Sequence, residues 1–175
     1  MSVRDGLLAV LSLGPAYGLQ LHAEFTSRAP HRAALNVGQV YSTLDRAVKT
    51  GLVESAGTTA DGLPLFRLTT DGQLRADAWM SAPAEGITSW DEMLDQVVIT
   101  ATITPTRVLG LAQGYRQAWG ACQISGADAI ALSTRLLSRA AIEWLASVDQ
   151  HLAAQDPMPL STTRPRRGRR PRALT

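Results

Sequence analysis

Apolar residues recur at helical spacing in three successive segments of the first half of the chain. The spacing predicts helices over 3–13 and 16–28, with a Gly-Pro breaker between them. A third helix is predicted to begin after Asn36, a favourable N-cap residue, and to end at Gly51. Its expected buried stripe consists of Val37, Val40, Leu44, Ala47 and Val48.

The apolar period then changes to two, which is the spacing of a β-strand with one buried face. LVESAG and LPLFRLT are predicted strands, and Asp61-Gly62 is a typical hairpin turn between them. Because Pro64 has no amide hydrogen to donate, an edge strand is expected there. Three helices and a hairpin predict a winged helix-turn-helix, followed by a fourth helix over about 70–81.

The second half of the chain carries only helical patterns. Ser89 and Glu92 form a capping-box signature, and a Thr-Pro pair starts a further helix. The last helix is predicted over about 127–154. Its apolar stripe consists of Ile130, Leu137, Ala141, Trp144, Leu145, Val148 and Leu152. Such a stripe needs a partner, so we expect a homodimer held by residues 88–154, mainly through the last helix with help from the first.

The predicted fold class is therefore mainly α with a small β-hairpin wing, in three regions. Residues 1–82 form the winged helix-turn-helix, 87–155 a helical dimerisation domain, and 156–175 a flexible Arg-rich tail. Residues 161–175 hold six arginines and no acidic side chain. The other 160 residues hold 11 basic and 15 acidic side chains, so the net charge of +2 conceals an acidic body and a cationic end.

The polar face of the third helix is suited to hydrogen bonding and poorly suited to packing. A helix of this size fits the major groove of DNA, where Gln39 can pair with adenine and Arg46 with guanine or a phosphate. Gly38 permits a close backbone approach, and Tyr41 can donate its hydroxyl to a phosphate. The further candidate DNA contacts are Ser42, Thr43, Lys49 and, on the second strand, Arg67. The alternative is a solvated helix face with incidental polar groups.

The tail segment RPRRGRRPR, residues 164–172, is a second candidate DNA contact. Its candidate residues are Arg166, Arg167, Arg169 and Arg170. Sequence-independent phosphate binding is one interpretation. The segment is also similar to AT-hook peptides, which lay an Arg-Gly-Arg core in the minor groove, although Arg170 interrupts the usual core. A solubilising tail is the third interpretation.

Four stretches resemble the PadR family of transcriptional regulators. GPAYGLQL, residues 14–21, is similar to a family motif, with Tyr17 and Leu19 in place of the usual histidine and tyrosine. VGQVYSTLDRAVKTGLVES resembles the family's recognition helix and first wing strand, and FRLTTDGQ its second wing strand. IEWLASVDQHL is similar to the closing helix of the dimerisation domain.

The resemblance implies a dimer that places two recognition helices in successive major grooves of an inverted-repeat operator. Some PadR relatives hold flat aromatic effectors between helices of the dimer, so Trp90 and Trp119 are candidate ligand-facing residues, with core packing as the alternative. One departure concerns the wing. Family wings often carry basic residues at the tip, whereas this chain has Asp61 there and no base before Arg67.

Other classes of protein lack their required residues. The single cysteine, Cys122, excludes a disulfide framework and indicates a reducing cytoplasm. The three histidines lie far apart, and we find no metal, cofactor or catalytic constellation, so an enzyme is not expected. We therefore expect a cytoplasmic, dimeric repressor that binds specific DNA and is released by a small aromatic effector. The alternative is a winged helix that contacts proteins without binding specific DNA.

Overall fold

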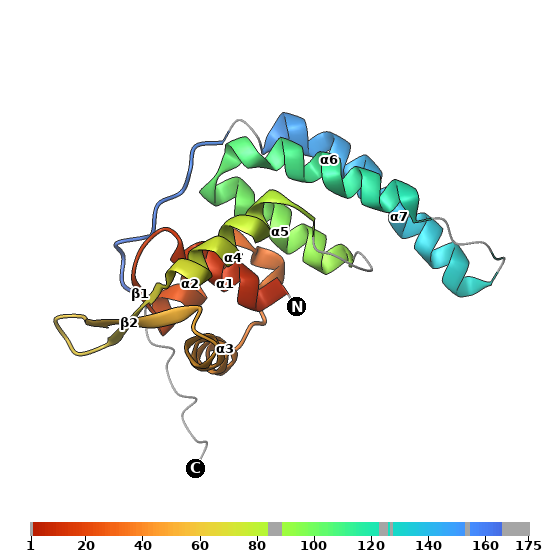
Figure 1. The fold of residues 1–175 in the computed structure, drawn as a ribbon. Helices are drawn as coiled ribbons and strands as arrows, with labels where there is room; N and C mark the ends of the chain where they lie inside the picture. Colours follow the sequence, from red (N-terminus) through yellow and green to blue (C-terminus); the bar gives the residue numbers. More distant parts are fainter. Residues whose placement is uncertain (1, 84–88, 123–125, 127, 153–154, 166–175) are drawn as a thin grey trace, which may run out of the picture.

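The computed structural model describes residues 2–83, 89–122, 126, 128–152 and 155–165 (Figure 1). Its elements are α1 (Ser2–Leu11), β1 (Ala16–Tyr17), α2 (Gly18–Arg28), the 3-10 helix η1 (Pro30–Arg32), α3 (Val37–Lys49), β2 (Val53–Thr58), β3 (Pro64–Leu68), α4 (Thr70–Ser81), α5 (Trp90–Ile103), α6 (Pro105–Ala121) and α7 (Ala129–His151). The order confirms the predicted mainly helical chain with a β-hairpin wing. Within the described residues, no helix is both long enough and apolar enough to cross a membrane.

Helix α1 forms the centre of the first core. Five consecutive residues, Leu7 to Leu11, are buried, so this helix is apolar on all sides where it passes between its neighbours. It packs against α2, α3, α4 and α5. The winged helix is therefore assembled around α1, and Leu7 to Leu11 of α1 pack against other elements of the same chain.

Helix α3 begins and ends where the sequence predicts. The Asn36 side chain accepts a hydrogen bond from the Gly38 amide at 2.7 Å, and the Gln39 side chain accepts one from the Asn36 amide at 3.1 Å. After the C-cap Thr50, Gly51 adopts φ of +72°, which a residue without a Cβ tolerates best. Of the expected buried stripe, Val48 is an exception because it lies on the exposed side.

The sheet differs from the prediction in two ways. Its strand order is β1-β3-β2, so β3 is the central strand and the expectation of an edge strand at Pro64 is wrong. Pro64 is tolerated because it is the first residue of β3, and β1 pairs only with Leu65 and Phe66. The predicted start of the second helix at residue 16 is wrong too, because Ala16 and Tyr17 form β1.

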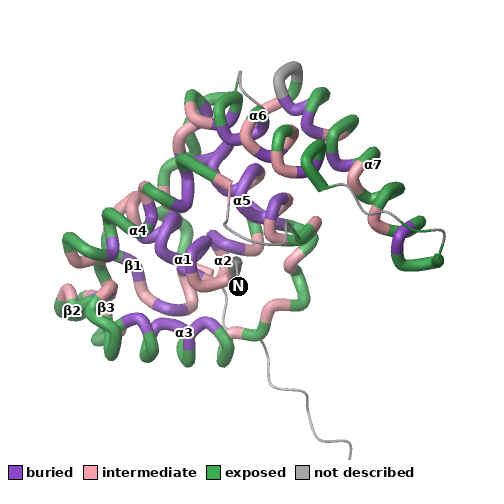
Figure 2. The backbone as a smooth tube through the Cα atoms, turned by 45° about the vertical axis from the view of Figure 1, so that its right-hand side comes forward, coloured by how far each residue is buried: buried purple, intermediate pink, exposed green. Residues whose placement is uncertain are grey.

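A second core lies between α5, α6 and α7, and α5 contributes to both cores. Ile99 and Ile103 of α5 pack in the first core, whereas Met93 and Val97 pack in the second. Figure 2 shows α6 and α7 extending away from the winged helix, with many exposed positions on α7. Ile130 and Leu137, which the sequence places in the buried stripe, are exposed, whereas Ala141, Leu145 and Val148 further along α7 are buried.

Residues 155–165, predicted as the start of a flexible tail, instead run back along the winged helix (Figure 1). Leu160 packs against the first core, and the Ser161 amide donates to the Glu24 carboxylate at 2.7 Å. Composition alone indicates disorder here, but these tertiary contacts compensate for the entropy of ordering the segment.

Gly72 provides a test of the packing between the wing and α4. A Cβ at this position would lie 1.9 Å from the Leu52 carbonyl oxygen, so Gly72→Ala forces the backbone apart. We expect the free energy of unfolding to fall by about 1–3 kcal/mol in chemical denaturation. Gly110→Ala is the control, because nothing lies within 4 Å of its Cβ and alanine favours a helix. Equal stability of the two variants would contradict this packing.

Candidate nucleic-acid interface

Helix α3 turns one polar side to solvent and packs the opposite side on the winged-helix core. Val40, Thr43, Leu44 and Ala47 are buried, and the exposed residues form a ridge along the helix. The ridge residues are Gly38, Gln39, Tyr41, Ser42, Asp45, Arg46, Val48 and Lys49. One ridge residue, Asp45, is not among the DNA contacts predicted from the sequence. It is an exposed acid at the middle of the ridge and could accept from a cytosine amino group.

The Gln39 side chain is held at the start of α3. Its carboxamide oxygen accepts from the Asn36 amide, while its amino group is left on the exposed ridge. Gln39 therefore serves both the helix cap and the proposed contact with adenine, which needs an acceptor and a donor together. A bidentate base contact would require the carboxamide oxygen to leave the cap.

Tyr41 lies against the first turn of α2. A Cβ added to Gly18 would come within 2.5 Å of the Tyr41 ring, so only glycine permits this contact. The ring thus joins the two helices of the helix-turn-helix, and the ring itself remains about one-third exposed, at 36%. Ser42 donates its hydroxyl to the Gln39 carbonyl at 3.0 Å and stays on the exposed ridge.

Thr43 does not lie on the ridge. It is only 7% exposed and accepts at Oγ1 from Arg46 Nη2 at 3.4 Å, so the expected contact between Thr43 and DNA is not supported. The helical period explains the difference, because Thr43 is one position from Leu44 and turns toward the core.

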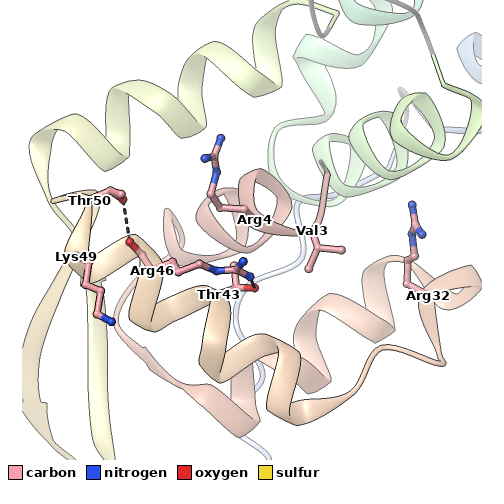
Figure 3. Close-up of a pocket in the computed structure, with 7 residues that line it drawn as sticks. All are labelled: Val3, Arg4, Arg32, Thr43, Arg46, Lys49 and Thr50. Atoms are coloured by element: carbon pink, nitrogen blue, oxygen red, sulfur yellow. Dashed lines mark hydrogen bonds between the residues drawn. The ribbon is translucent and has the colours of Figure 1, made fainter.

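Arg46 folds back along its own helix and borders a cationic cleft. Its Nε donates to the Ser42 carbonyl at 3.2 Å. The cleft has a volume of about 490 Å³ and lies between α3 and the N-terminal turn of α1 (Figure 3). Its lining residues are Val3, Arg4, Arg32, Thr43, Arg46, Lys49 and Thr50. Four of the seven are basic, so the cleft favours anions.

Acidic partners reduce part of this positive charge. Arg4 lies 3.2 Å from Asp5, and Arg32 lies 2.9 Å from the buried Asp95. The hydrogen bond from Arg32 to Asp95 raises the pKa of the Arg32 guanidinium above its ordinary value. For Arg46 and Lys49, the ion pairs among the described residues include no carboxylate partner, so these two supply most of the available charge.

The wing presents little positive charge of its own. Arg67 of β3 forms an ion pair at 2.8 Å with Glu54, the residue opposite it on β2. Asp61 in the turn accepts from the Thr59 hydroxyl at 2.6 Å and pairs with Arg164. The hydrogen bond from Thr59, followed by that from Arg164, lowers the pKa of the Asp61 carboxyl. Arg67 can therefore reach a phosphate only in competition with Glu54.

The two candidate ligand-facing tryptophans lie with the second core. Trp119 is buried and donates its indole N–H to the Met93 sulfur at 3.0 Å. Trp90 is half-buried, and its ring centroid lies 5.9 Å from that of Trp144. These contacts agree with packing, and a ligand-facing role for Trp90 and Trp119 stays a prediction. The tail candidates Arg166, Arg167, Arg169 and Arg170 lie outside the described residues.

The fold and the exposed ridge of α3 define a winged helix-turn-helix protein. Residues 7–78 match the model of the transcriptional regulator PadR-like family. Among solved structures, the chain is similar to one described as the crystal structure of Bacillus subtilis PadR in complex with operator DNA. The identity is 15%, the match covers 87% of this chain and 99% of that chain, and the TM-score is 0.42. No curated protein matches the chain.

Gln39→Glu separates helix capping from base reading. Glutamate can still accept from the Asn36 amide, so the stability of the fold should stay within about 0.5 kcal/mol of the parent. It has no amino group to donate to adenine, so the preference for the operator over unrelated DNA should fall by about 1–3 kcal/mol. The measurement is competitive binding of both DNAs.

Tyr41→Phe is the control for a contact without base information. It keeps the ring over Gly18 and removes only the hydroxyl, so binding to operator and unrelated DNA should weaken by the same factor. A base-reading role for Gln39 is wrong if Gln39→Glu also weakens both DNAs equally.

Proposed function

We propose that the protein is a sequence-specific DNA-binding transcriptional regulator that acts in the cytoplasm as a dimeric repressor. The observation that carries the proposal is the exposed polar ridge of α3, held on a buried scaffold by its cap, by Tyr41 and by Gly51. Such a helix fits the major groove, and its polar groups match base edges and phosphates. The match of residues 7–78 to the model of a family of transcriptional regulators supports the same function.

The second candidate is a winged helix that contacts proteins. The acid in the wing turn and the Arg67–Glu54 pair favour it, because both weaken attraction to phosphate. The two candidates are separated by gel shift with DNA from upstream of the protein's own gene. Specific retention that Arg46→Ala weakens supports the regulator, and equal, weak retention of every DNA supports the protein-contact module.

The proposed dimer uses the exposed face of α7. Leu132 and Leu136 are four residues apart and share one side of the helix, opposite the side packed on α6. Ile130, which is 77% exposed, and Leu137 lie on another side of α7. A cluster of exposed large apolar residues is typical of a protein interface. The second copy is the expected occupant, because an inverted-repeat operator requires a two-fold protein. Leu7 to Leu11 of helix α1 are buried in their own chain, and the expected help of this helix in the dimer stays a prediction.

Leu136→Glu is expected to break the dimer. Sedimentation of the parent at micromolar concentration should give about twice 18.7 kDa. The variant should sediment as a monomer, because a charge in an apolar interface costs several kcal/mol when it stays unpaired. Leu74→Glu is the matched control: Leu74 is 64% exposed, Leu136 is 59%, and Leu74 lies on α4. If the parent protein sediments as a monomer, the proposed dimer is wrong, and so is the proposed operator with two half-sites.

Release by a small effector is also part of the proposal, and the cationic cleft supports it. An anion bound there would draw on Arg46, which also belongs to the exposed ridge of α3. Binding to DNA and binding of the anion would then compete for one side chain, which is sufficient for mutual weakening. An aromatic effector fits this site if it carries a carboxylate.

Benzoate tests this part of the proposal against benzamide, its neutral counterpart. At constant ionic strength, benzoate should release bound DNA and benzamide should not. Arg4→Gln should raise the benzoate concentration needed by about fivefold to tenfold, because it removes one charge-assisted contact in the cleft. Asp5 keeps a partner in this variant, since Arg75 donates to it at 3.0 Å. Equal release by both compounds would contradict an effector role for the cleft.

A further inference from the structure

The chain returns from the end of the second core to the wing. Residues 157–165, here called the strap, pass first over α5, where the Met158 amide donates to the Thr102 carbonyl at 2.7 Å. Figure 1 shows this segment descending beside the helical layers toward β1 and the wing. The strap thus connects the far part of the molecule to the side that carries α3.

The middle of the strap forms hydrogen bonds with a buried ion pair on α2. Glu24 and Arg28 are 6% and 3% exposed, and their side chains meet at 2.9 Å. Arg28 Nη2 also donates to the carbonyls of Met158 and Pro159, at 3.1 and 3.2 Å. Ser161 donates its amide to Glu24 Oε1 at 2.7 Å.

These bonds make the docking of the strap specific. Burial lowers the pKa of the Arg28 guanidinium, and the neighbouring Glu24 opposes that shift. A buried charge pair is costly unless further hydrogen bonds satisfy it, and the strap supplies three of them. Leu160 adds an apolar contact with the first core. The strap is therefore held on α2 by hydrogen bonds and on the first core by an apolar contact.

The strap ends at the wing turn. Arg164 pairs with Asp61 and offsets the acid that stands where DNA-binding wings often carry a base. The described chain stops at Pro165, next to this pair. The following residues, 166–175, hold five arginines and no acidic side chain. The most cationic part of the sequence therefore begins at the wing.

We propose that the strap is an anchoring device that starts the arginine segment 166–175 at the wing, where the segment makes the phosphate contacts that the wing lacks. The proposal rests on the proposed DNA-binding function. Its physical basis is effective concentration: a basic segment tethered at the DNA-facing side meets phosphate more often than one joined through a longer free linker. A freely moving arm and a purely structural strap are the competing interpretations.

Two changes separate charge from anchoring. Deleting residues 166–175 removes five arginines and leaves the strap, so the slope of log affinity against log salt should flatten by about 3–4 units per bound chain. Leu160→Ser with Ser161→Pro releases the strap by removing its apolar contact and its donor to Glu24. This variant keeps every arginine, so affinity should fall by about threefold to tenfold with the salt slope almost unchanged.

The cycle of single and combined changes gives the decisive comparison. If anchoring matters, deleting 166–175 should weaken binding less in the released variant than in the parent. Thr162→Ala, at an exposed strap position, is the control and should bind like the parent. The anchoring is overturned if the released variant binds DNA as tightly as the parent while the protein without residues 166–175 binds weakly. That result would show that the arginine segment acts as a freely moving arm.

Hydrogen exchange tests the strap without DNA. The amides of Met158 and Ser161 should exchange slowly in the parent, because each donates to a named acceptor. In the released variant, where residue 161 is proline and has no amide hydrogen, the Met158 amide should exchange rapidly. Exchange at unprotected rates in the parent would overturn the strap even if DNA binding holds. Slow exchange in a parent that binds no DNA would instead reject the proposed function and leave the strap's docking intact.

Discussion

The geometry of the molecule depends on α5, which is buried on two opposite sides. It contributes Ile99 and Ile103 to the winged-helix core and Met93 and Val97 to the core beneath α6 and α7. The fully buried Asp95 adds a polar connection, because it accepts from Arg32 at 2.9 Å and from His31 at 2.7 Å. A helix shared by two cores cannot rotate in one without disturbing the other. The position of α3 relative to α7 is thereby fixed within one chain, and a dimer through α7 would fix the spacing of two recognition helices.

Three polar side chains of α3 are already hydrogen-bonded to their own helix or its N-cap. Gln39 accepts from the cap, Ser42 donates to a carbonyl, and Arg46 donates to Ser42 and Thr43. Contact with DNA must therefore exchange these bonds for others, and the net gain per contact is smaller than the bond itself. This exchange favours discrimination between operator and unrelated DNA. At a wrong base, a side chain loses its hydrogen-bond partner within the protein and gains no partner on the DNA.

Local rules predicted much of the fold, and they failed where tertiary contacts decide. The N-cap Asn36, the glycine at 51 and the Asp-Gly turn each have a mechanism that acts over a few residues, and all three are confirmed. The two-residue strand β1 exists only because β3 pairs with it, so periodicity could not indicate it. The exposure of Ile130 depends on which side of α7 meets α6. Of the candidate site, the ridge residues could be predicted from the helical period, but the buried Thr43, the paired Arg67 and the cleft required the packed structure.

Charge along the chain is distributed against the simplest expectation for a protein that approaches a polyanion. The residues before 161 sum to a formal −4, and the wing turn carries Asp61. Positive charge is instead concentrated at the end of α3, around the cleft, and in the final 15 residues. Acids in the body repel phosphate over roughly a Debye length, about 8–10 Å, so contacts closer than that are needed to overcome them. A strap that brings Arg164 to the wing would allow the proposed arginine segment to make such contacts without a basic wing. Residues 61 and 164 are far apart in the sequence, but the strap brings the Arg164 guanidinium next to the Asp61 carboxylate. The two charges offset each other, and the ion pair holds the end of the strap at the turn.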